Sequence, residues 1–103
     1  IAHITGGGFY ENIPRILNTS SKAVIDFNSE DWPSRNLYSW IGSKGVSQED
    51  MLHTFNCGIG MVISVHPDEV DIALEALNKE DQFAKVIGKV EKKKEEELTI
   101  QFI

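Results

Sequence analysis

AHITGGGFYENIPR, residues 2–15, is the stretch around which this chain is organised. The three glycines at 6–8 remove every Cβ from a short piece of backbone, so that the backbone can adopt positive φ and approach a ligand closely. Free N–H groups of a loop that enters a helix bind phosphate or carboxylate well. Four residues that can donate hydrogen bonds flank the turn: His3, Thr5, Asn12 and Arg15. The stretch therefore predicts an anion site, and the alternative is a tight turn that serves only packing.

A short helix is expected after the glycines, because apolar residues recur there at helical spacing: Phe9, Ile13, Ile16 and Leu17. Pro14 is tolerated only near the first turn of a helix. We therefore expect the helix to start near Glu11 or Asn12 rather than at Gly8. The glycines do not form a P-loop, which requires Gly-Lys-Ser/Thr, or a dinucleotide fingerprint, which requires a further glycine at position 11.

Composition limits the classes of function. A chain of 103 residues is one domain or part of one, and its formal charge of −6 argues against a nucleic-acid-binding surface. The single cysteine cannot form an intrachain disulfide, and the three histidines do not have the spacing of metal ligands, so no metal site is predicted. No apolar run approaches the roughly 20 residues of a membrane span. We expect a cytoplasmic protein with no membrane partner.

The remaining pattern predicts an α+β fold, with a mixed β-sheet and helices packed mainly on one face in a two-layer arrangement. Strands are expected at 23–27, 58–65, 83–90 and 98–102. The apolar run at 58–65 indicates a central strand. The alternation at 98–102 indicates an edge strand paired with the strand before it, with the charged residues 91–97 as a solvated hairpin turn or loop between them.

Three more helices are predicted. One begins at Trp32-Pro33, buries Leu37, Tyr38 and Ile41, and ends at the glycines 42 and 45. Another begins after Ser47, which with Asp50 resembles a capping box, and carries Met51, Leu52 and Phe55 inward. A third opens at Pro67, and its apolar stripe consists of Val70, Ala73, Leu74 and Leu77.

The motif at 3–15 resembles the C-terminal domain of aminoimidazole ribonucleotide synthetase, also called phosphoribosylformylglycinamidine cyclo-ligase. The residues that carry the resemblance are His3-Ile4-Thr5-Gly6-Gly7-Gly8 and Glu11-Asn12-Ile13-Pro14-Arg15. A second block, Met51 with Thr54-Phe55-Asn56-Cys57-Gly58-Ile59-Gly60-Met61, is similar at the expected distance, as is the segment 85–90. The resemblance covers nearly the whole chain. It implies that residues 1–103 are the C-terminal portion of that domain and that the ATP-binding N-terminal domain is absent from this chain.

The resemblance also implies a reaction: ATP-dependent ring closure of formylglycinamidine ribonucleotide to aminoimidazole ribonucleotide in purine biosynthesis. ATP and Mg²⁺ are expected mainly on the absent domain, the full enzyme is expected to be a homodimer, and this chain alone is expected to be inactive. The site residues implied are His3 as the catalytic candidate, with Thr5, Gly6, Gly7, Gly8 and Asn12 as substrate-binding residues.

Several alternatives stay open at this point. The chain can instead belong to a related ATP-using synthase, of the selenophosphate or thiamine-phosphate type, or be a non-catalytic binding module. His3 can be a structural hydrogen-bonding residue, and Asn12 can either orient a ligand or cap the helix. Cys57 is better interpreted as a small buried hydrophobic residue than as a nucleophile, because no base can be placed beside it from the sequence.

Overall fold

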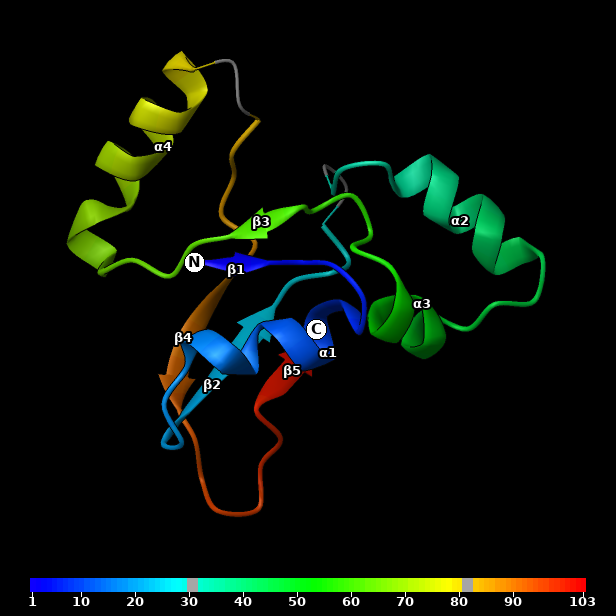
Figure 1. Ribbon diagram of the computed structural model, residues 1–103, viewed down its shortest axis with the longest axis horizontal. Helices are drawn as coiled ribbons and strands as arrows, with labels where there is room; N and C mark the ends of the chain where they lie inside the picture. The colour runs from blue at the N-terminus through cyan, green and yellow to red at the C-terminus, as the bar shows by residue number, and fades with distance from the viewer. Residues whose placement is uncertain (30–31, 81–82) are drawn as a thin grey trace.

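The computed structural model describes residues 1–29, 32–80 and 83–103, which form an α+β fold (Figure 1). Its main sheet has three strands in the order β4-β2-β5. The central strand β2 (Ser21–Ile25) runs antiparallel to β4 (Gly88–Lys92) and parallel to β5 (Ile100–Phe102). The sheet is therefore mixed, as the sequence predicts. A separate antiparallel ribbon pairs β1 (Ala2–His3) with β3 (Met61–Val62).

In the described part of the chain, four helices and two 3-10 turns connect the strands. Helix α1 (Gly8–Asn12) leads into the 3-10 turn η1 (Pro14–Ile16), and η2 (Pro67–Glu69) leads into α4 (Val70–Lys79). Between them lie α2 (Arg35–Ser43) and α3 (Gln48–Thr54). The predicted cap of α3 is confirmed, because the Ser47 hydroxyl accepts a hydrogen bond from the Asp50 N–H at 3.1 Å. The predicted stripe of α4 is half-buried.

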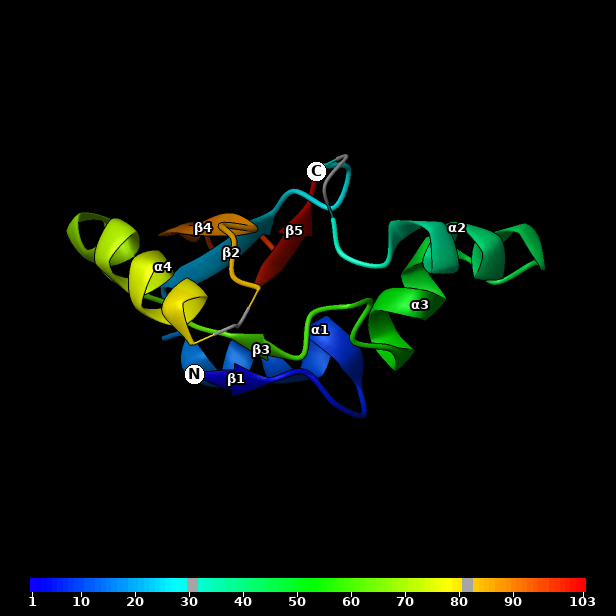
Figure 2. The same ribbon diagram turned by 90° about the horizontal axis from the view of Figure 1, so that it is seen from above.

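The core lies between the main sheet and the layer that contains α1 and the β1–β3 ribbon (Figure 2). Phe9 of α1 is fully buried at its centre, with its ring 6.0 Å from Trp32 and 5.9 Å from Phe102 between centroids. Such tilted and edge-on aromatic pairs add to the stabilisation that comes from burying apolar area. The other buried members of this core are Ala2, Ile4, Ile13, Ala23, Ile25, Phe27, Met51, Leu52, Cys57 and Ile100.

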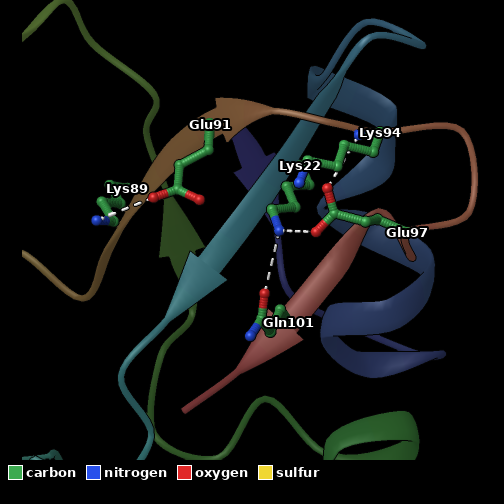
Figure 3. A network of polar contacts seen from close by, with 6 residues as sticks. All are labelled: Lys22, Lys89, Glu91, Lys94, Glu97 and Gln101. Carbon is green, nitrogen blue, oxygen red and sulfur yellow. Dashed lines mark hydrogen bonds and ion pairs between the residues drawn. The ribbon is translucent and has the colours of Figure 1, made fainter.

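The opposite face of the main sheet carries a network of polar side chains (Figure 3). Lys22 alternates with the core residue Ala23, so its side chain emerges on this second face, where it is 7% exposed. Its ammonium donates to the Glu97 carboxylate and to the Gln101 amide oxygen, the latter at 3.2 Å. The hydrogen bond from Lys22 lowers the pKa of Glu97, with help from the Lys94 backbone N–H. This network fastens the β4–β5 connection to the central strand.

The prediction for the start of α1 was wrong. The helix begins at Gly8 and ends at Asn12, and Pro14 opens η1 instead. The preceding turn ends at Gly7, which has a left-handed conformation with φ of 89°. The helix therefore begins at the next residue, Gly8. The constraint that proline imposes therefore acts on the 3-10 turn.

The expected central strand at 58–65 was also wrong. Only Met61–Val62 are in β3, and Met61 and Ile63 are 58% and 41% exposed. Cys57 and Gly58 both have positive φ, 52° and 91°, so the chain turns where the strand was expected to begin. After that turn the strand pairs only with the short β1 in the part of the chain that the structure describes.

The last strand alternates and lies at an edge, as predicted, but its partner was predicted wrongly. It pairs in parallel with β2, with Ile100 opposite Ala23, and not with β4. The more apolar β2 takes the central position because Ala23, Val24 and Ile25 are buried, whereas Val90 of β4 is 48% exposed. The strand predicted at 83–90 is found at 88–92, so it extends into the charged segment.

Two predicted inner faces need correction. Helix α2 begins at Arg35 rather than at Trp32-Pro33, and Leu37 is 52% exposed, whereas Tyr38 and Ile41 are half-buried. In α3, Met51 and Leu52 are buried as expected. Phe55 follows the helix end and is 39% exposed. These helices cover the core with fewer side chains than their apolar spacing indicates.

Candidate functional site

The glycine turn is fixed at both ends. Before it, the Ile4 N–H donates to the Gly60 carbonyl at 2.8 Å, which continues the pairing of the β1–β3 ribbon. Within it, the Gly8 N–H donates to the Thr5 carbonyl at 2.9 Å. Gly7 and Gly8 have φ of 89° and 61°, a backbone conformation that costs a residue with a Cβ about 1–2 kcal/mol. The turn then enters α1 directly.

The structural surroundings differ at each of the glycine positions 6, 7 and 8. A Cβ on Gly8 would overlap the backbone carbonyl of Leu52, so glycine is required for α1 to pack against α3. For a Cβ on Gly7 the nearest atoms would be those of the Glu11 side chain, which folds back over the turn. A Cβ on Gly6 would meet nothing within 4 Å, and its φ is not left-handed. Packing and backbone strain therefore explain the glycines at positions 7 and 8, but not the one at position 6.

Asn12 holds the turn from inside the protein. Its side chain is 3% exposed, and its amide nitrogen donates to the carbonyls of Thr5, Gly6 and Gly8 at 3.4, 3.2 and 2.7 Å. A buried amide needs such partners, since an unsatisfied one costs about 1–3 kcal/mol. The structure thus brings Asn12 and the turn together, and its amide nitrogen is occupied by the turn itself.

The outer side of the turn is open. Thr5 and Gly6 are exposed and Gly7 is half-buried. Among the residues that the structure describes, no protein acceptor is found for the backbone N–H groups of Gly6 and Gly7. Adjacent free N–H groups favour the binding of anions. The arrangement can therefore bind an anionic group.

His3 lies apart from the glycine turn and Asn12, on the exposed side of β1 opposite Met61. It precedes the turn by one buried residue, Ile4, and its exposed side chain is accessible to a ligand. Arg15 is exposed on η1. The geometry therefore assembles Thr5, Gly6–Gly8 and Asn12 in one turn, with His3 at its edge.

Cys57 belongs to a second turn, at 56–58, and is fully buried. Burial raises the pKa of its thiol to about 11, so the thiolate needed for nucleophilic attack is scarce at neutral pH. Its carbonyl accepts the indole N–H of Trp32 at 2.7 Å, and the Gly58 N–H donates to the Asn56 side chain at 2.9 Å. The interpretation of Cys57 as a small buried hydrophobic residue is confirmed.

Residues 1–101 match the sequence model of the family described as AIR synthase related protein, C-terminal domain. The match includes the glycine turn, Asn12 and the second turn. The chain belongs to this family.

The AIR synthase-related domain is part of a superfamily of ATP-using enzymes. No helix among the described residues has both the length and the apolar character needed to cross a membrane. The described residues also contain no cluster of three or more His, Cys, Asp or Glu that could hold a metal ion.

One contact in this AIR synthase-related domain was not predicted from the sequence. The rings of Tyr10 and His53 stack with centroids 4.0 Å apart and planes 11° apart. Burial raises the pKa of Tyr10, and the charge of Glu49 adds to the shift. The stack joins α1 to α3 beside the glycine turn. The two residues are far apart in sequence, so no local pattern could have paired them.

Proposed function

We propose that this chain forms part of the substrate side of the cleft in a phosphoribosylformylglycinamidine cyclo-ligase. In this reaction the formyl oxygen of formylglycinamidine ribonucleotide is phosphorylated by ATP. The amidine nitrogen then attacks the formyl carbon, the C–O bond breaks, and phosphate leaves as the imidazole ring closes. Phosphorylation is chemically necessary because an amide-like oxygen is a poor leaving group without it. The products are aminoimidazole ribonucleotide, ADP and phosphate.

The observation that supports this role is the pair of free N–H groups at Gly6 and Gly7 on the open side of the turn. They suit the 5-phosphate of a ribonucleotide, which needs donors rather than a formal positive charge. The Glu11 carboxylate beside Gly7 disfavours a second negative charge there. We therefore place the phosphate closer to Gly6, where space is open, and Thr5 can add its hydroxyl.

His3 is the candidate for proton transfer or for a hydrogen bond to the substrate, because an imidazole can do either near neutral pH. It is exposed next to the turn, within the same short stretch as the donors.

ATP and Mg²⁺ are proposed to bind mainly on the N-terminal domain of the full enzyme. The described residues of this chain do not fit a Mg²⁺ site, since they lack a cluster of acidic or histidine ligands. No step is therefore assigned here to a metal. The homodimer implied by the resemblance, the cytoplasmic location and the inactivity of this chain alone stay predictions.

The test is substrate-dependent release of ADP by the full-length protein with formylglycinamidine ribonucleotide. We expect turnover in the wild type and at least a tenfold loss in His3→Ala with an unchanged melting temperature, because His3 is exposed. His66→Ala is the matched control: its side chain is 67% exposed and it precedes η2 as the N-cap, outside the glycine turn. No ADP release by the wild type would reject the cyclo-ligase and favour another ATP-using member of the superfamily. Undiminished turnover in His3→Ala would reject the role of His3 alone.

A further inference from the structure

The direction in which a peptide N–H points is set by the carbonyl of the preceding residue. In a trans peptide unit these two groups lie in one plane and point in opposite directions. The N–H of Gly6 shares a peptide unit with the Thr5 carbonyl, and the N–H of Gly7 shares one with the Gly6 carbonyl. Whatever fixes those two carbonyls therefore also fixes the two N–H groups.

Asn12 is the group that fixes them. Its amide nitrogen donates to both carbonyls, at 3.4 and 3.2 Å, from a buried position below the turn. Its shortest bond, 2.7 Å to the Gly8 carbonyl, anchors the same side chain to the first residue of α1. The carbonyls of Thr5 and Gly6 are thus held inward, and the N–H groups of Gly6 and Gly7 are directed away from Asn12.

We propose that Asn12 is a positioning residue that does not contact the substrate but orients the N–H groups of Gly6 and Gly7 toward its phosphate. Only the identity of the ligand as a ribose 5-phosphate rests on the function proposed above. The position of Asn12 supports this role over direct contact, because the side chain is 97% covered and its donors already have acceptors within the protein. Gly6 is then the point of closest approach, where the backbone has no side chain and the space is open.

The first test is Asn12→Asp in the full-length protein, with kcat and KM for formylglycinamidine ribonucleotide and the melting temperature measured together. Asp keeps the shape of Asn but cannot donate from an ionised side chain. We expect KM to rise at least tenfold while kcat stays within threefold, because binding is weakened and the reacting atoms are not touched. A kcat loss at unchanged KM, or wild-type values of both in the folded variant, would overturn the positioning role.

A second measurement covers the case in which Asn12→Asp does not fold. The wild-type protein is titrated with ribose 5-phosphate and followed by ¹H–¹⁵N spectra. We expect the backbone resonances of Gly6 and Gly7 to shift most and the side-chain NH₂ of Asn12 to shift less. The largest shift at the Asn12 NH₂ would identify a direct contact and overturn the proposal, as would the absence of shifts at Gly6 and Gly7.

Gly6→Ala tests the point of approach without altering Asn12. Its matched control is Gly60→Ala, because a Cβ there also meets nothing within 4 Å and the φ of Gly60 is not left-handed. Both variants should melt like the wild type. Gly6→Ala should bind ribose 5-phosphate at least fivefold more weakly, and Gly60→Ala should bind it normally. Normal binding by Gly6→Ala would overturn the assignment of Gly6.

Together, these experiments distinguish the proposed reaction from the proposed role of Asn12. If the wild type releases no ADP with formylglycinamidine ribonucleotide but ribose 5-phosphate shifts Gly6 and Gly7, the cyclo-ligase assignment fails and the role of Asn12 stands. If the wild type is active and the Asn12 NH₂ is the group that responds to ribose 5-phosphate, the reaction stands and the positioning role fails.

Discussion

The turns at residues 5–8 and 56–58 each place two consecutive residues in the left-handed region: Gly7 and Gly8 in the first, Cys57 and Gly58 in the second. Each also uses an asparagine side chain. Asn12 donates to carbonyls of the first turn from the end of α1, whereas the Asn56 oxygen accepts the Gly58 N–H inside the second. The backbone conformations are thus similar and the hydrogen bonding differs.

The two turns differ in how far their polar groups are exposed. In the second turn the Cys57 carbonyl is bonded to Trp32, the Gly58 N–H is bonded to Asn56, and the Cys57 side chain is fully buried. In the first turn the carbonyls point inward and the N–H groups of Gly6 and Gly7 have no protein acceptor among the described residues. Because Cys57 is fully buried, the second turn serves packing, whereas the first turn has free N–H groups on an exposed side and can serve binding.

The largest expected effect tests what the two turns share. Gly8→Ala and Gly58→Ala should each lower the free energy of unfolding by about 3 kcal/mol or more, from left-handed strain plus overlap with backbone. The overlapping atoms are the Leu52 carbonyl for Gly8 and the Pro33 oxygen, 2.6 Å from the added Cβ, for Gly58. Urea unfolding measures both values. Gly45→Ala, with φ of 99° and open space, is the control and should lose only about 1 kcal/mol. A loss at Gly8 no larger than at Gly45 would contradict the packing argument.

The next prediction concerns the reactivity of the Cys57 thiol and tests whether the second turn serves packing. Burial raises the pKa of Cys57 to about 11 from 9.0, so at pH 8 the folded protein has roughly a hundredfold less thiolate than an unperturbed thiol. We expect the reaction with 5,5′-dithiobis(2-nitrobenzoate) to be slowed by at least that factor relative to the urea-unfolded chain. Because the pKa is raised, the rate in the folded state should keep rising with pH above 9. Equal rates in the folded and unfolded states would show an accessible thiol.

The smallest effect separates stability from binding. Trp32→Phe removes the indole donor to the Cys57 carbonyl and should lower the free energy of unfolding by about 2 kcal/mol. The KM of the full-length protein for formylglycinamidine ribonucleotide should not change, in contrast to Asn12→Asp. The control Trp40→Phe alters a side chain that is 59% exposed and should stay within about 0.5 kcal/mol of the wild type. A raised KM in Trp32→Phe would show that the second turn also affects the site.

Local chemistry made part of the molecule predictable. Ser47 and Asp50 specify a helix start within four residues, and the stripe from Val70 to Leu77 specifies one face of α4, because both depend only on helix geometry. The alternation of Ile100, Gln101 and Phe102 specifies a strand with one buried side. The glycines likewise predict a turn, because only they adopt its φ values without a Cβ penalty.

Tertiary structure decided the rest, because it depends on groups that are distant along the chain. β2 takes the central position of the main sheet because three of its apolar residues are buried. β5 therefore pairs with β2 and not with β4. The requirement for glycine at position 8 comes from the backbone of α3, some 44 residues later. The sequence by itself determined that residues 5–8 turn and that Asn12 is near. Only the fold decided that the Asn12 amide faces inward and the N–H groups face outward, because the buried side of the turn exists only once α1 packs on the core.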